Sequence, residues 1–469
     1  MAWLRRLRWL VMASLMGAAA CGGGAAPPAG ELPSEVRVRG EAVVKLVHAD
    51  ARARWWLAER LARWPAAVGD RDPGVRRLVR ARVERDGEET LFLPPPSDRL
   101  TDAVVHPSGD WSAVGVDEAM RPFLVRGAPD GSVRERRVLD DPELATDGRA
   151  TFGEAPVTAL EVGALSSDGV RLAADGEEIV AVVMSRYNAV LAYRWSWRDG
   201  AWERGPRTLV SPALSITPYL PIGGSYDDFD AMVAWFLVHV GSDEEGRTYV
   251  AHWVNPRRLE RHNEVFGTAL APLKDDGDRS TRPSDVLLSR VERDGRIGFA
   301  TVVGARNVDD EPYGLAVGRD RVAVVGRARR AVGFDNTEWD AVVAIVDGNG
   351  APLATRIHDG ALSAMGQVAA FAADGTLWVG GTEGFAQNPE GFSLFDEGQP
   401  LLLRVSGERV EPMAAMLPST SGHAELRALH VDGAGITVGG LERGPLTHTG
   451  DADPSLIVAD GFLARRGIR

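Results

Sequence analysis

The chain has little cysteine and little lysine: one cysteine and two lysines in 469 residues. A single thiol cannot form an internal disulfide or a thiolate zinc cluster, so neither stabilises this fold. The sequence also lacks a G-x-S-x-G nucleophile elbow, an H-E-x-x-H zinc motif and a lysine after a glycine-rich phosphate loop. A formal net charge of −13 argues against a nucleic-acid partner, which would need a basic face. We can therefore name no catalytic residue.

Acidic clusters are the remaining candidates for a metal site. Asp275, Asp276 and Asp278 lie in a polar stretch, and carboxylates this close can bind calcium. None of the clusters matches the full calcium-loop pattern, and solvated turn charge is the alternative interpretation. His106 and His430 lie beside turns, and we interpret them as packing or turn residues rather than metal ligands. Similar acidic clusters occur at residues 226–230, 309–311 and 451–453.

The N-terminus predicts export and a lipid anchor. Three arginines precede a short apolar run at residues 9–16, and small residues then lead to Cys21. The run is shorter than the roughly 20 residues that span a bilayer, so a cleaved signal is the better interpretation. The pattern resembles the lipobox of bacterial lipoproteins, which implies that residues 1–20 are removed and Cys21 is acylated. Ala18 stands where that family normally has Leu. The alternative is ordinary cleavage after Ala20, which would leave a free thiol.

The residues after Cys21 predict a flexible attachment. Residues 22–30 are glycine, alanine and proline, a composition typical of a tether, so we assign residues 21–34 to it. Gly22, rather than an acidic residue, follows the cysteine, which resembles lipoproteins sent to the outer membrane. We therefore expect a monomer in the cell envelope, held at the outer membrane by its N-terminal lipid.

The C-terminal third of the chain repeats itself. One element is a β-rich run that ends in a turn, at residues 285–291, 340–346 and 401–405. A second element is a strand, a turn and a strand that closes on Gly326, Gly380 or Gly439. Its closing glycines are 54 and 59 residues apart. A period in this range, with four strands in each unit, is typical of a propeller.

These strands resemble bacterial secreted β-propeller repeats, well over residues 285–469 and loosely before them. The resemblance implies an all-β domain over residues 35–469, a single propeller of about seven four-stranded blades, with six or eight possible. Residues 255–284 form a polar insertion, and Ala51 to Trp64 suit either a helix or a strand. The motifs are structural, so they predict a fold and no activity.

The two chain ends predict how the ring closes. Residues 460–466 repeat the outer strand of a unit and then the chain stops, so this unit lacks a fourth strand. Residues 35–39 form an unassigned strand at the other end, in which Val36 and Val38 alternate with arginines. Pairing the two segments would complete the last blade and remove two exposed strand edges.

Two classes of function remain open. The first is a binding or scaffold protein that uses loops on one propeller face to hold a protein or glycan partner. The second is an exported propeller enzyme, a quinoprotein-type dehydrogenase or a lyase, with a polar site at the central channel. The enzyme hypothesis requires His, Arg and Asp side chains from different blades to converge. The missing catalytic motifs favour binding, and no cofactor is expected apart from the calcium candidate.

Overall fold

A computed structural model describes residues 33–468 with internal gaps. The gaps are 51–52, 64–74, 86–87, 93–98, 118–120, 140–169, 185–188, 213–237, 274–284, 330–338, 361–362, 386–397, 421 and 443–459. The described residues form 28 strands, the helix α5 (Pro256–Phe266) and the short 3-10 turn η3 (Ala414–Met416). The prediction of an all-β fold is therefore confirmed. None of the described helices is long and apolar enough to cross a bilayer.

The described strands form seven four-stranded antiparallel sheets. The first three are β2 (Ala42–Ala49), β3 (Ala53–Arg63), β4 (Val75–Arg85), β5 (Glu88–Phe92); β6 (Arg99–Val105), β7 (Trp111–Val116), β8 (Pro122–Gly127), β9 (Val133–Val138); and β10 (Val170–Asp175), β11 (Glu178–Met184), β12 (Val190–Arg198), β13 (Ala201–Ser211).

The next three sheets follow the same order along the chain. They are β14 (Val238–Ser242), β15 (Thr248–Val254), β16 (Asp285–Val291), β17 (Ile297–Val303); β18 (Asp310–Val317), β19 (Arg321–Arg329), β20 (Trp339–Asp347), β21 (Pro352–His358); and β22 (Ser363–Phe371), β23 (Leu377–Phe385), β24 (Gln399–Ser406), β25 (Arg409–Pro412). The last sheet joins β26 (Ala424–Val431), β27 (Gly435–Glu442) and β28 (Asp460–Gly467) to β1 (Glu35–Val38).

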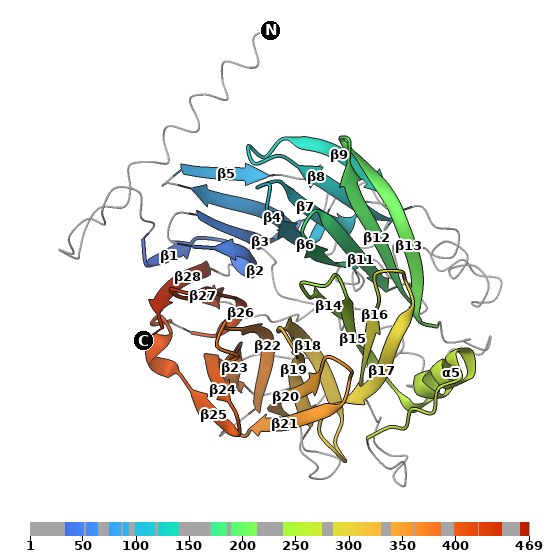
Figure 1. The fold of residues 1–469 in the computed structure, drawn as a ribbon. Helices are drawn as coiled ribbons and strands as arrows, with labels where there is room; N and C mark the ends of the chain where they lie inside the picture. Colours follow the sequence, from blue (N-terminus) through green and yellow to red (C-terminus); the bar gives the residue numbers. More distant parts are fainter. Residues whose placement is uncertain are drawn as a thin grey trace.

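The sheets are arranged radially around a centre, with the first strand of each innermost (Figure 1). Each first strand contacts the first strand of the next sheet, from β2 through β6, β10, β14, β18, β22 and β26 back to β2. Apolar side chains of neighbouring sheets meet in clusters between them, such as Val325 and Val343 with Val379 and Leu403. This radial packing is a β-propeller, as the repeat predicted.

The ring has two different faces. We call the side on which the first strands begin the loop face, because the connections between sheets and from second to third strands start and end there. The opposite side is the turn face, where the first and third strands end in short turns. Gly375, with a φ of +85°, supplies the left-handed conformation that one such turn needs.

The two chain ends pair as the sequence predicted. β1 lies antiparallel to β28, with Val36 opposite Leu463 and Arg37 opposite Phe462. Arg37 forms an ion pair of 2.7 Å with Glu442 of β27. The N-terminal strand thus supplies the fourth strand of the sheet that the C-terminus leaves unfinished.

Two open points of the sequence analysis are settled by the backbone. β3 occupies Ala53–Arg63, so the segment that suited either conformation is a strand. The polar insertion begins with the helix α5 rather than irregular chain. Asn255 caps this helix, because its side chain accepts a hydrogen bond of 2.9 Å from the backbone N–H of Arg258, and Gly267 ends it with a φ of +64°.

The repeated glycines have a steric role. The strand registers match Gly326 with Gly381 and Gly440, each of the latter one residue after the Gly380 and Gly439 that the sequence comparison aligned. A Cβ at any of Gly326, Gly381 or Gly440 would clash with a first-strand carbonyl oxygen. Close to each glycine, the first strand contains a β-bulge. In β18 the bulge leaves Tyr313 without a pairing partner in β19. Bulges redirect side chains. The counterparts in the neighbouring first strands are Gln367 and Arg427.

Candidate functional site

Polar side chains from three neighbouring first strands meet at the loop-face end of the ring. We call these residues the rim cluster; they are Glu311, Tyr313, Gln367, His423, Glu425 and Arg427. The bulges of β18, β22 and β26 place Tyr313, Gln367 and Arg427. Glu311 and Glu425 each lie two residues before the bulged residue of their strand. Their backbone carbonyl oxygens approach the repeat glycines Gly326 and Gly440.

Glu425 is the centre of one half of the cluster. The side chain is fully buried and accepts hydrogen bonds from Arg427 Nε at 2.6 Å and from Gln367 Nε2 at 3.1 Å. Burial alone would raise the pKa of Glu425. The charge of Arg427 and the hydrogen bonds from His423 and Arg427 outweigh burial and hold that pKa well below its usual range. Glu425 therefore stays ionised at neutral pH.

Two hydrogen bonds orient the ring of His423. The backbone N–H of Gly398 donates to His423 Nδ1 at 3.1 Å, so that nitrogen carries the lone pair. The proton on Nε2 then lies toward Glu425 Oε1, 2.8 Å away. This arrangement lets the histidine act as a donor that orients the carboxylate.

Glu311 is the centre of the other half. Its Oε2 accepts hydrogen bonds from the Tyr313 hydroxyl at 3.0 Å and from Arg327 Nε at 2.7 Å. The Arg327 guanidinium also lies over the Trp339 ring, 4.1 Å from its centroid. Burial raises the pKa of Tyr313, and the negative charges of Glu311 and Glu425 act in the same direction. β22 packs against both β18 and β26, so the strands that carry the two halves lie on either side of it.

The electrostatics of the rim cluster suit binding better than proton transfer. Each central carboxylate has an arginine partner, Arg327 for Glu311 and Arg427 for Glu425. Glu425 stays ionised and Tyr313 stays protonated at neutral pH, whereas a general acid or base works best with a pKa near the working pH. Gln367 Oε1 is buried without a hydrogen-bond partner among the described residues. Such an acceptor is a place for a water or a ligand hydroxyl.

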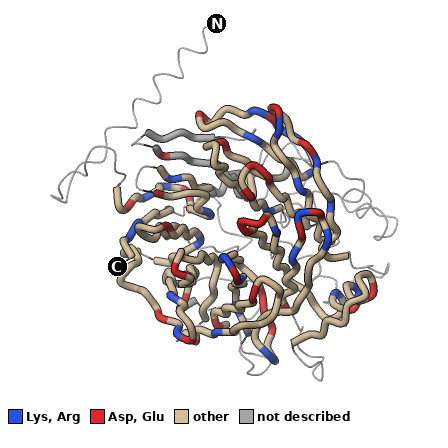
Figure 2. The backbone as a smooth tube through the Cα atoms, viewed as in Figure 1, with Lys and Arg blue, Asp and Glu red and all other residues tan. Residues whose placement is uncertain are grey.

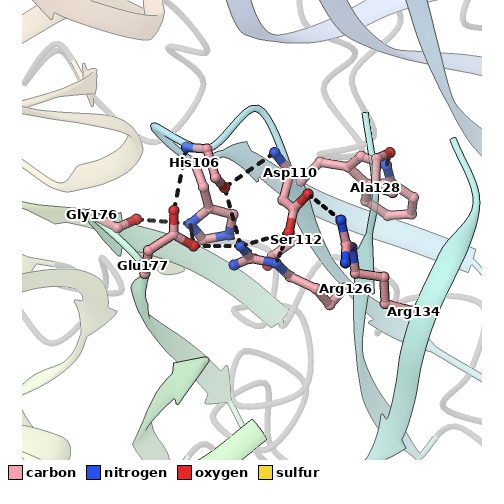
Figure 3. Close-up of polar contacts among 10 residues, drawn as sticks. His106, Asp110, Ser112, Arg126, Ala128, Arg134, Gly176 and Glu177 are labelled. Carbon is pink, nitrogen blue, oxygen red and sulfur yellow. Dashed lines mark hydrogen bonds and ion pairs between the residues drawn. The ribbon is translucent and has the colours of Figure 1, made fainter. Parts of the chain in front are cut away.

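A second polar network lies between two sheets at the turn face. We call it the clamp; its residues are His106, Asp110, Ser112, Arg126 and Glu177 (Figure 3). His106 Nδ1 donates to the carbonyl of Gly176 at 2.8 Å, and His106 Nε2 lies 2.7 Å from Ser112 Oγ. The first of these hydrogen bonds crosses from the β6–β9 sheet to the β10–β13 sheet.

Arg126 carries the charge of the clamp. The guanidinium pairs with Asp110 at 3.0 Å and with Glu177 of the next sheet, and it lies over the ring of Trp197 at 5.2 Å. Burial lowers the pKa of His106, and the positive charge of Arg126 adds to this effect. Because Ser112 and His106 are both buried and the Nδ1 partner is a carbonyl oxygen, this serine–histidine pair is structural and not a nucleophile with its base.

Some of the candidate residues named from the sequence lie within the described structure and others lie outside it. Asp275, Asp276, Asp278 and Cys21 lie outside the described residues, as do the acidic clusters at 226–230 and 451–453. The described residues contain no group of three or more His, Cys, Asp or Glu side chains that could hold a metal ion. His430 lies in β26 with its ring 5.6 Å from that of His48, and His106 belongs to the clamp.

The cluster at residues 309–311 is the one described acidic candidate. Asp310 is fully buried, and its Oδ2 accepts a hydrogen bond of 2.8 Å from the backbone N–H of Ala305. Burial raises the pKa of Asp310, and the nearby Asp285 and Asp309 raise it further. Asp310 lines a small cavity of about 10 Å³ between β16–β17 and β18–β20. The adjacent Glu311 belongs to the rim cluster, so interpreting this stretch as solvated turn charge is wrong for both residues.

Sequence reasoning missed the rim cluster. Glu311 and Glu425 stand at corresponding places before bulges, but their spacing of 114 residues shows no local motif. The signal that would have found them is the repeat glycine. Each one marks where a second strand touches the carbonyl of a first-strand residue.

Comparison with known proteins identifies no family for this chain. No protein-family model and no curated protein matches the chain. Among solved structures, an ulvan lyase of polysaccharide lyase family 25 aligns with a TM-score of 0.43 and 12% identity, over 74% of this chain and 78% of that one. The WD40 domain of Pan2 from Neurospora crassa has a TM-score of 0.42 and 9% identity, with 92% and 91% covered.

A third similar solved structure is itself a β-propeller domain. The β-propeller domain of the Trilobed protease from Pyrococcus furiosus aligns with a TM-score of 0.37 and 8% identity, over 74% of this chain and 80% of that one. At these values the similarities carry no argument about activity, substrate or partner.

Proposed function

We propose that this chain is a seven-bladed, lipid-anchored binding protein of the cell envelope that holds an uncharged glycan at the rim cluster. The observation that carries the proposal is the Gln367 carbonyl oxygen, which has no partner among the described residues, beside carboxylates already paired with arginines. Gln367 Oε1 therefore calls for a hydrogen-bond donor from a ligand and not for a charged group. Sugar hydroxyls supply donors without charge.

The test is a thermal unfolding assay on the full-length protein in detergent. Maltohexaose, cellohexaose and chitohexaose serve as uncharged probes, and an oligogalacturonate serves as the acidic comparison. A ligand at a hundred times its Kd stabilises by about 2.7 kcal/mol, so we expect an uncharged sugar to raise the Tm clearly. Gln367→Ala should abolish that rise, while Gln399→Ala, an exposed glutamine of β24, should keep it. A sugar response that survives in Gln367→Ala contradicts the proposal, as does no response to any sugar.

A propeller lyase with its polar site at the rim is the second candidate function. The observation in its favour is the convergence of Tyr313 from β18 with Arg427 from β26 and His423, which directly precedes β26. The enzyme hypothesis named histidine, arginine and aspartate, and the rim cluster has glutamates where aspartates were expected. The raised pKa of Tyr313 and the lowered pKa of Glu425 weigh against the lyase, because neither group exchanges its proton readily near neutral pH. Incubation with the oligogalacturonate, followed by ultraviolet absorbance of an unsaturated product, distinguishes the two. A steady absorbance rise that Tyr313→Phe removes would favour the lyase.

The anchor has its own test. The proposal requires Cys21 to be the acylated first residue of the mature protein. Cell fractionation should find the wild type in the membrane fraction and the Cys21→Ser variant outside it, with altered mobility on a gel. Cys21→Ser protein that stays in the membrane fraction with unchanged mobility would show that lipidation is wrong.

A further inference from the structure

The chain enters the ring on the turn face. Arg465 of β28 donates its backbone N–H to Ser34 O at 2.7 Å. Arg465 is near the turn-face end of β28, because Gly467 pairs there with Gly435. The Arg54 side chain donates to the Pro33 carbonyl, and Arg54 follows the turn that joins β2 to β3. Two independent contacts therefore place the start of the described chain on this face.

The rim cluster lies at the opposite end of the first strands. Glu311 and Glu425 are each the second residue of their strand, counted from the loop face. A strand of eight residues, such as β26, is about 25 Å long at 3.3 Å per residue. The cluster and the point of chain entry are thus separated by about the thickness of the ring.

The tether is short on this scale. If residues 21–32 form the tether that their composition predicts, a flexible coil of twelve residues would have a root-mean-square reach of about 19 Å. To bring the rim cluster to the lipid, the tether would have to run around the outer edge of the ring and along its full thickness. The average orientation therefore keeps the loop face outward.

Two described turns of the turn face carry acidic and basic side chains that pair with each other. Exposed acidic and basic side chains alternate there in pairs, Asp294 with Arg296 at 2.7 Å and Asp320 with Arg321 at 2.9 Å. Figure 2 shows basic and acidic positions interspersed along the described backbone around the ring.

From these observations we infer that the anchored protein directs its turn face toward the membrane and presents the rim cluster to the aqueous side. The inference rests on the proposed lipid anchor. It assigns the partner of the rim cluster to molecules that arrive from the aqueous phase, such as a glycan, and excludes the headgroups of the membrane that holds the protein.

The experiment measures energy transfer from a dye on the protein to a labelled lipid. Lipidated protein, in which the Cys21 thiol is consumed, is reconstituted into phosphatidylethanolamine–phosphatidylglycerol vesicles with a rhodamine headgroup acceptor. One variant carries the donor at Ala373→Cys, in the exposed turn between β22 and β23. The other carries it at Arg306→Cys, in the exposed loop-face connection before β18. Both substitutions leave the rim cluster intact.

We expect a transfer efficiency at least twofold higher at position 373 than at position 306. The same pair in soluble Cys21→Ser protein, mixed with the vesicles, should show no difference. If the lipidated protein floats with the vesicles but the two efficiencies are equal or reversed, the orientation is wrong while the anchor stands. If the wild type does not float, or Cys21→Ser protein floats equally well, the anchor is wrong and the orientation falls with it.

Discussion

The rim cluster and the clamp contain the same kinds of side chain and differ in what surrounds them. Both combine histidine, arginine and carboxylates from neighbouring sheets. In the clamp the Arg126 side chain is only 1% exposed and pairs with carboxylates of two sheets, whereas Arg427 in the rim cluster is 19% exposed. The clamp joins two sheets near the turns, and the rim cluster stands where the first strands begin. Each network holds one buried polar atom without a hydrogen-bond partner among the described residues, Arg126 Nη1 in the clamp and Gln367 Oε1 in the rim cluster. Composition and unmet hydrogen bonds therefore do not by themselves identify a site; access distinguishes the two networks.

The largest expected effect is on the clamp. Arg126→Met leaves the carboxylates of Asp110 and Glu177 without their shared guanidinium between two sheets. Breaking a buried ion pair typically costs about 3 kcal/mol or more. Chemical denaturation should show a loss of this size. Arg296→Met, which removes an exposed partner of Asp294, should change the free energy of unfolding by less than about 0.5 kcal/mol. Equal losses in the two variants would mean that the clamp does not stabilise the fold.

The next effect connects the repeat to the rim cluster. Gly440→Ala forces a methyl group against the carbonyl of Glu425, and overpacking of this kind costs about 1–3 kcal/mol. Gly433→Ala, where an added Cβ meets nothing within 4 Å, serves as the matched control. Of the two variants, only Gly440→Ala should have a lower free energy of unfolding and a smaller sugar-induced rise in Tm. If the Gly440→Ala protein unfolds and binds sugar as the wild type does, the repeat glycine does not support the rim cluster.

These two predictions also mark how far the sequence leads. The turns, the strand alternation and the period of the closing glycines are local, so they reveal a propeller and its closure. The bulges at Tyr313, Gln367 and Arg427 depend on how a second strand packs against a first strand, and the repeat glycine close to each bulge is its local sign. The polar network at Arg126 likewise depends on a contact between residues 51 positions apart. Side chains that meet only through packing were therefore missed, while the strands that bring them together were predicted.

A smaller effect is expected from pH. Burial lowers the pKa of His106, so the folded state favours the neutral ring more than the unfolded chain does. The stability from this group is fully present above the unfolded pKa, near 6.5, and is lost as the pH falls below it. Unfolding measured at about pH 7.5 and about pH 5 should show a smaller pH effect in His106→Gln than in the wild type. His252, whose pKa burial lowers to about 3, remains in both proteins and acts in the same direction. Identical pH effects would exclude a contribution from His106.

The smallest effect contrasts two adjacent carboxyl groups of the loop face. Burial raises the pKa of Asp310, so its contribution is present below the unfolded pKa of 3.8 and lost as the pH rises through the folded value. Asp310→Asn keeps an acceptor for the Ala305 N–H and removes this loss. We expect a gain of about 1 kcal/mol at neutral pH that disappears in acid. Glu311→Gln, which separates Arg327 from its carboxylate, should instead destabilise the protein. A destabilised Asp310→Asn variant at neutral pH would contradict the assignment.

The shared last sheet gives this protein a particular order of assembly. β1 is made first and β28 last, yet the two pair residue by residue, with more than 400 positions of chain between them. Long-range pairings of this kind slow folding, because the entropy of closing the loop is lost before the contacts form. Until β28 is made, every intermediate is an open arc with unsatisfied strand edges at both ends. Completion of the ring is therefore a late step of folding, which no intermediate that lacks β28 can reach.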